Sequence, residues 1–120
     1  MSGVRIEGEM TEKKILGLKN CDTCRKALKA LQAGDDTVSL QDVREAPLTE
    51  AELQTFLDAF GEALVNRRST TWRTLSDEER TGDPLALLQA HPTLMKRPVI
   101  QSGDQLFLGW SASTKAALGQ

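Results

Sequence analysis

Two cysteines separated by two residues, Cys21 and Cys24, lie where a short apolar segment at residues 14–18 gives way to a helical pattern. The apolar residues that follow recur at the spacing of a helix with one buried face: Cys24, Ala27, Leu28 and Leu31. A thiol at the start of a helix meets unpaired amide groups and the positive end of the helix dipole, which favour the thiolate. The sequence therefore predicts a strand, then a reactive cysteine, then a helix.

A second strand is predicted at residues 37–42, where apolar and polar residues alternate. A strand, a helix and a strand this close together predict a parallel strand pair with a right-handed crossover. Beyond it, Thr49 and Glu52 match a capping box that begins a helix, and Gly61 ends it. Residues 63–92 predict further short helical pieces, so that a helical insert spans about residues 48–92.

The remaining chain predicts an antiparallel hairpin and a closing helix. Its strands are expected at residues 98–101 and 105–108, and Ser111 can cap a helix that runs through Leu118. The resulting order is β-α-β, helical insert, β-β-α, which is an α/β fold with a mixed sheet. We expect one domain at residues 14–120, preceded by a flexible N-terminal extension at residues 1–13.

Composition excludes several classes of protein. Hydrophobic residues make up 39% of the 120 residues and the formal net charge is -2, so the basic excess of a nucleic-acid-binding protein is missing. No apolar run approaches the roughly 18 residues of a membrane span, and we expect a cytoplasmic monomer without membrane contact. In that compartment a cysteine pair is catalytic, redox-sensing or metal-binding. Two cysteines and one histidine fall short of the roughly four ligands of a zinc site, and no bound cofactor is expected.

Three motifs resemble the signatures of the arsenate reductase/Spx family, and the element order resembles the thioredoxin-like fold. The motifs are KNCDTCRKA at residues 19–27, NRRSTTW at 66–72 and KRPVI at 96–100. The resemblance covers about residues 14–118. It is closest to a bacterial subgroup regarded as glutathione-dependent thiol reductases.

Within this resemblance Cys21 matches the catalytic cysteine of the family. The nearby cations of Lys19, Arg25 and Lys26 also favour its ionisation, whereas Asp22 opposes it. For Cys24, two roles remain open. It is either a resolving cysteine, which attacks a mixed disulfide formed on the first thiol, or a small apolar residue of the core.

The resemblance also implies residues that bind an anionic substrate. Arg97 matches an arginine that contacts the oxyanion in arsenate reductases, and Arg68 matches a second one, with the adjacent Arg67 as the alternative. We expect a cis peptide bond before Pro98, and we expect Asn20 to orient the catalytic loop. A guanidinium group binds a carboxylate or a tetrahedral oxyanion through two parallel hydrogen bonds.

The predicted function is that of a thiol-disulfide oxidoreductase with glutathione as co-substrate. One alternative is an arsenate reductase that uses glutathione and glutaredoxin. This alternative is weakened because residues 106–110 occupy the place of the third arginine of those enzymes. The other alternative is a redox-sensing regulator of the Spx type, which binds the RNA polymerase α subunit and uses the cysteine pair as a switch.

Overall fold

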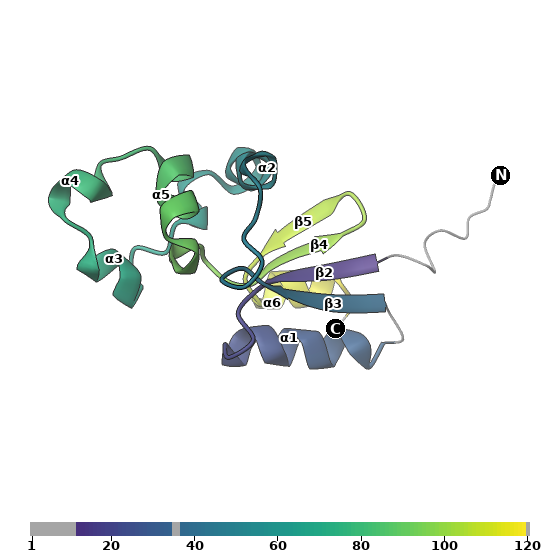
Figure 1. Ribbon diagram of the computed structural model, residues 1–120. Helices are drawn as coiled ribbons and strands as arrows, with labels where there is room; N and C mark the ends of the chain where they lie inside the picture. The colour runs from purple at the N-terminus through teal and green to yellow at the C-terminus, as the bar shows by residue number, and fades with distance from the viewer. Residues whose placement is uncertain (1–11, 35–36, 120) are drawn as a thin grey trace. The chain divides into compact units, whose positions relative to one another are not determined.

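The computed structural model describes residues 12–34 and 37–119 (Figure 1). It divides into two compact units, of which the first comprises the chain up to Gln41 and from Arg97 onward, and the second Asp42–Lys96. The expected extension at residues 1–13 lies outside the described residues except for Glu12 and Lys13, which begin the first described strand. No helix in the described part of the chain has the length and apolar character needed to cross a membrane.

The first unit is built on a four-stranded mixed sheet with the order β3-β2-β4-β5. Its strands are β2 (Glu12–Gly17), β3 (Thr37–Asp42), β4 (Val99–Ser102) and β5 (Gln105–Leu108). β4 pairs antiparallel with both β2 and β5, and β2 and β3 run in the same direction in Figure 1. The predicted thioredoxin-like α/β fold with a mixed sheet is confirmed.

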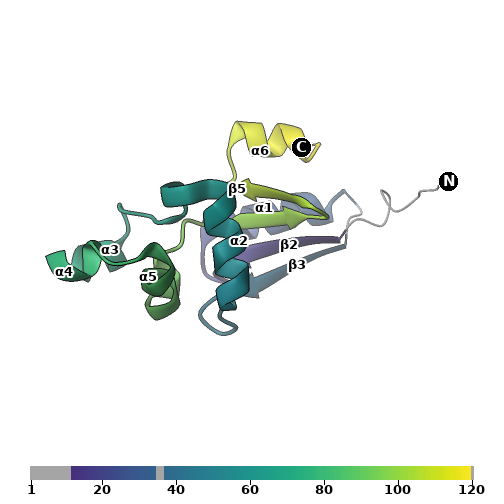
Figure 2. The same ribbon diagram turned by 90° about the horizontal axis from the view of Figure 1, so that it is seen from above.

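Helix α1 (Asp22–Gln32) covers one face of this sheet (Figure 1). The paired strand residues Ile15 and Ile100 form the centre of the contact. From the helix, Cys24, Ala27 and Leu31 pack against them, and all five side chains are fully buried. Figure 2 shows α6 (Ala112–Ala117) beside β5, at the opposite edge of the sheet from β3. The buried face of α1 therefore fixes where the helix begins relative to the end of β2.

The second unit is built from short helices, in agreement with the helical pieces predicted from the sequence. Its elements are α2 (Glu50–Phe60), η2 (Gly61–Leu64), α3 (Thr70–Thr74), α4 (Asp77–Arg80), α5 (Pro84–Ala90) and η3 (Pro92–Leu94). Compared with the expected range of 48–92, this unit extends further in both directions. Val43 and Met95 explain the difference, because both are almost fully buried and line the same small apolar pocket of this unit.

The start of α2 provides a test of the fold. The Thr49 hydroxyl accepts a hydrogen bond from the Glu52 amide at 3.1 Å, and the Glu52 carboxylate accepts one from the Thr49 amide at 2.9 Å. We expect Thr49→Ala to lower the free energy of unfolding by about 1 kcal/mol, as measured by chemical denaturation. Thr55→Ala is the matched control, because the Thr55 hydroxyl only donates to the Ala51 carbonyl of the same helix. An equal loss in both variants would contradict the capping box.

Candidate active site

Cys21 is the residue at which the chain turns from β2 into α1. Its backbone is extended, with φ -91° and ψ 119°, and it precedes the first helical residue. Its amide donates to the Leu18 carbonyl at 3.1 Å, and its carbonyl accepts from the Arg25 amide at 3.0 Å. These two bonds place the half-buried thiol of Cys21 at the start of the helix, where amide groups have no partner within the helix.

Opposing influences act on the ionisation of Cys21. Burial is the largest of them and raises the pKa of the thiol, because it disfavours the charged form. Hydrogen bonds from the Cys24 amide, the Cys24 thiol, the Thr23 amide and the Arg97 side chain act in the opposite direction and prevail. The pKa of Cys21 is therefore lowered, and the thiolate, which is the nucleophilic form, is favoured.

Cys24 has the opposite environment, although it lies only one turn further along α1. Its side chain has no exposed surface and belongs to the core between the helix and the sheet. Burial raises the pKa of Cys24 to about 11, and the negative charge of Cys21 adds to this effect, while the backbone of Leu18 acts against it. Cys24 is thus a protonated thiol that donates to the Cys21 sulfur. Neither cysteine forms a disulfide in this structure.

Arg97 reaches the same site from the other end of the chain. It lies two residues before the start of β4, and its side chain hydrogen-bonds to the Cys21 sulfur. The bond between Arg97 and Pro98 is cis, as expected. Pro98 is fully buried, and its carbonyl accepts the Gly109 amide at 2.7 Å. The structure therefore brings Cys21, Cys24 and Arg97 together.

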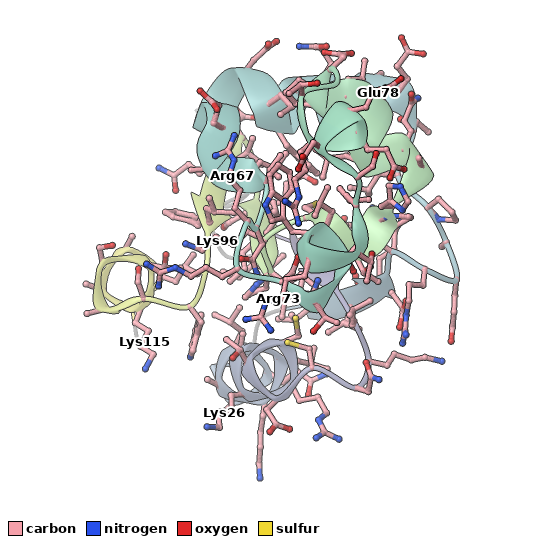
Figure 3. The ribbon with its side chains drawn as sticks, turned by 90° about the vertical axis from the view of Figure 1, so that its left-hand side faces the viewer. Lys26, Arg67, Arg73, Glu78, Lys96 and Lys115 are labelled. Carbon is pink, nitrogen blue, oxygen red and sulfur yellow. The ribbon has the colours of Figure 1, made fainter. Side chains whose placement is uncertain are left out.

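Arg25 and Lys26, two of the cations near Cys21 in the sequence, are not among the largest influences on its pKa. The Arg25 guanidinium lies 2.6 Å from the Asp22 carboxylate, so the charges of this pair offset each other beside the thiol. Lys26 projects outward from α1 in Figure 3. Asn20 lies exposed in the turn just before Cys21, and its role in orienting the loop stays a prediction.

Arg68 belongs to the second unit, and its approach to Cys21 stays a prediction. It lines an open hollow of about 640 Å³ together with Arg67 and Lys96. The Arg67 guanidinium is 2.6 Å from the Glu62 carboxylate and lies over the ring of Trp72, 5.5 Å from its centre. Figure 3 shows Arg67 and Lys96 on the same side of this unit.

Within residues 12–34 and 37–119, neither Arg68 nor Lys96 forms an ion pair with an acidic side chain. Of the two arginines that the sequence left open, Arg68 is therefore the one with an uncompensated charge. The sequence analysis missed Lys96 as a candidate binding residue, although it lies directly before Arg97 in the KRPVI motif.

The sequence analysis also missed Gly17, at the end of β2. The Cys24 sulfur lies so close to this glycine that a side chain there would overlap it. A glycine inside an apolar strand often marks such a close approach, and this signal was present in the sequence. No group of three His, Cys, Asp or Glu side chains that could hold a metal ion occurs in the described ranges.

Several known proteins resemble this chain, among them two relatives and one solved structure. An uncharacterised protein from Haemophilus influenzae is 38% identical over 107 residues, which cover 81% of this chain and 90% of the relative. The global transcriptional regulator Spx of Streptococcus mutans is 26% identical over 98 residues, or 77% of this chain and 72% of the regulator. The solution structure of an arsenate reductase (ArsC) related protein from Brucella melitensis has a TM-score of 0.68 and 32% identity, covering 88% of this chain and 92% of that one.

A family model also matches most of the chain. The model of the ArsC family matches residues 16–118, a range that includes both cysteines, the helical unit and the hairpin. It therefore covers the thiol site, the end of β2 and the other elements that build the site. The chain belongs to the ArsC family.

Proposed function

We propose that this protein is a thiol-disulfide oxidoreductase in which Cys21 is the nucleophile and glutathione the co-substrate. The observation that carries the proposal is the ionisable thiol at the start of α1, which the Arg97 side chain and two backbone amides support. A cysteine with a lowered pKa beside a cation in a partly exposed position has the properties of a reactive thiol. The cytoplasm, with its reducing thiol pool, suits such a reaction.

The reaction proceeds by thiol-disulfide exchange. The Cys21 thiolate attacks one sulfur of a glutathione-containing disulfide and forms a mixed disulfide, and the leaving thiolate takes a proton from solvent. Cys24 then loses its proton and attacks the Cys21 sulfur, which forms an internal disulfide and releases glutathione. Two electrons pass from the cysteine pair to the substrate, and two further thiols, from glutathione or glutaredoxin, return them.

Formation of the mixed disulfide on Cys21 favours the subsequent attack by Cys24. While Cys21 is a thiolate, its negative charge helps to raise the pKa of Cys24. Once Cys21 is part of a mixed disulfide, this charge is gone, and only burial holds the pKa of Cys24 high. Deprotonation of the second thiol therefore becomes easier at the moment when it is needed.

The cations are suited to an anionic substrate such as glutathione. Arg97 lies beside the reacting sulfur, and Arg68 and Lys96 line the hollow of the second unit. Guanidinium and ammonium groups bind carboxylates, of which glutathione has two. We propose that Arg68 and Lys96 bind these carboxylates.

Two other functions use the same cysteine. The similarity to Spx of Streptococcus mutans favours a redox-sensing regulator that binds the RNA polymerase α subunit when the cysteine pair is in one oxidation state. The ArsC-related protein of Brucella melitensis favours arsenate reduction. A pull-down with the polymerase α subunit and a turnover assay with arsenate separate these two from the disulfide reductase.

The pH dependence of alkylation tests the nucleophile. Because hydrogen bonds favour the thiolate and lower the pKa of Cys21, its alkylation rate should have a midpoint below that of a free cysteine measured in the same way, and should fall as the pH drops through that midpoint. Arg97→Ala should move the midpoint upward. Lys29→Ala, which removes an exposed cation at the far end of α1, should leave it unchanged. A midpoint at or above that of free cysteine would contradict the proposed nucleophile.

Incubation with oxidised glutathione tests the two cysteine roles. Mass spectrometry should detect an internal disulfide in the native protein, a trapped glutathione adduct in Cys24→Ser and neither product in Cys21→Ser. If the native protein retains the glutathione adduct instead, Cys24 is a core residue and not a resolving thiol. The absence of any Cys21-dependent product would overturn the proposed function.

Substitutions in the hollow test substrate binding. Arg68→Ala and Lys96→Ala should each raise KM for oxidised glutathione by about two- to fivefold, the scale of a solvent-exposed ion pair. The pH midpoint of Cys21 alkylation should not change in either variant. Lys29→Ala removes the same charge from a different surface and should leave KM as it is. Equal KM values in all three variants would show that the hollow does not bind the substrate.

A further inference from the structure

The Cys24 sulfur occupies the space in which a side chain of residue 17 would lie. A Cβ atom built on Gly17 would overlap this sulfur. Its next neighbours are the Cβ atoms of Cys24 at 3.5 Å and of Arg97 at 3.8 Å, which are ordinary van der Waals distances. A single atom, the sulfur, therefore excludes a side chain at position 17.

The backbone itself does not require glycine at this position. The described glycines with positive φ are Gly61, Gly103, Gly109 and Gly119, and Gly17 is not one of them. Gly17 is the last residue of β2, in a conformation that alanine also adopts. Glycine inside a strand costs stability, so the close approach of the sulfur accounts for its presence.

The position of this sulfur determines what it can contact. Next to Gly17, the Leu18 backbone hydrogen-bonds to the Cys24 sulfur, and the Leu18 carbonyl accepts the Cys21 amide at 3.1 Å. The short turn after β2 therefore contacts both cysteines. Displacement of the Cys24 sulfur from Gly17 would separate it from this turn and from the Cys21 sulfur.

We propose that Gly17 is a positioning residue for the cysteine pair, because the space left by its missing side chain holds the Cys24 sulfur against the end of β2, within hydrogen-bonding distance of the Cys21 sulfur. Its contribution to turnover rests on the proposed function. The displaced thiol would no longer support the Cys21 thiolate, and it would be poorly aligned to attack a mixed disulfide.

Gly17→Ala tests this role through two readouts. The added methyl group should displace the Cys24 sulfur, so that the pH midpoint of Cys21 alkylation moves upward. Formation of the internal disulfide after reaction with oxidised glutathione should slow by up to about 100-fold, the scale of a misplacement of about 1 Å. A general loss of packing would not by itself change the ionisation of Cys21.

The same substitution in a Cys24→Ala background is the matched control. Without the sulfur, the methyl group meets only the two Cβ atoms at ordinary distances. Gly17→Ala should then change neither the alkylation midpoint nor the denaturation midpoint relative to Cys24→Ala alone. The comparison is a double-mutant cycle, and a nonadditive result measures the coupling between the two residues.

The outcomes are distinct. In one outcome, Gly17→Ala alone does not fold, while the double variant Gly17→Ala/Cys24→Ala folds and has the same alkylation midpoint as Cys24→Ala. In that case the sulfur is the obstacle to a side chain at position 17, and the inference holds. An equal shift of the alkylation midpoint in both backgrounds, or no shift in either, would overturn it. Because alkylation needs no glutathione, this result is independent of the proposed function. That proposal fails separately if native Cys21 does not react with oxidised glutathione.

Discussion

The contact between the start of α1 and the end of β2 determines the properties of the whole site. Ala27 and Leu31 anchor the helix on the sheet, and the missing side chain of Gly17 lets the Cys24 sulfur approach the strand. This packing sets the position of the first helical turn, and with it the amide groups that surround the Cys21 thiol. A small shift of the helix would change the environment of both sulfurs at once.

Two thiols in adjacent turns differ in ionisation because one is in the core and the other at the helix start. The partly exposed Cys21 gains more from its hydrogen bonds than it loses through burial. The fully buried Cys24 does not, and it remains protonated. Each state supports the other, because a protonated thiol donates to a thiolate and the thiolate disfavours loss of the neighbouring proton. In the proposed function, this difference in ionisation lets the first sulfur attack before the second.

Some of the cationic side chains that the structure describes lie next to a carboxylate, which offsets their charge, and others do not. Only a cation whose charge is not offset in this way is well suited to bind an anionic substrate. Arg25 and Arg67 each lie 2.6 Å from a carboxylate, which offsets their charge. Arg97 hydrogen-bonds to the Cys21 sulfur, where it favours the thiolate. Recognition of an anionic substrate in the hollow of the second unit would therefore rely on Arg68 and Lys96, which line it without an acidic partner among the described residues, and the proposed function assigns them that role.

Local features of the sequence were sufficient to predict the mixed α/β fold, the capping box at Thr49 and the position of Cys21 at the start of a helix, because helix starts and strand patterns depend on residues only a few positions apart. Only the tertiary structure decided three other features of the site. These are the environment of Cys24, the place of Arg97 beside Cys21 and the need for glycine at position 17. Each depends on β2 and β4, which are distant in sequence and meet through sheet pairing. Burial and hydrogen bonding across such contacts set the ionisation of a thiol, and neighbouring residues in the chain do not specify them.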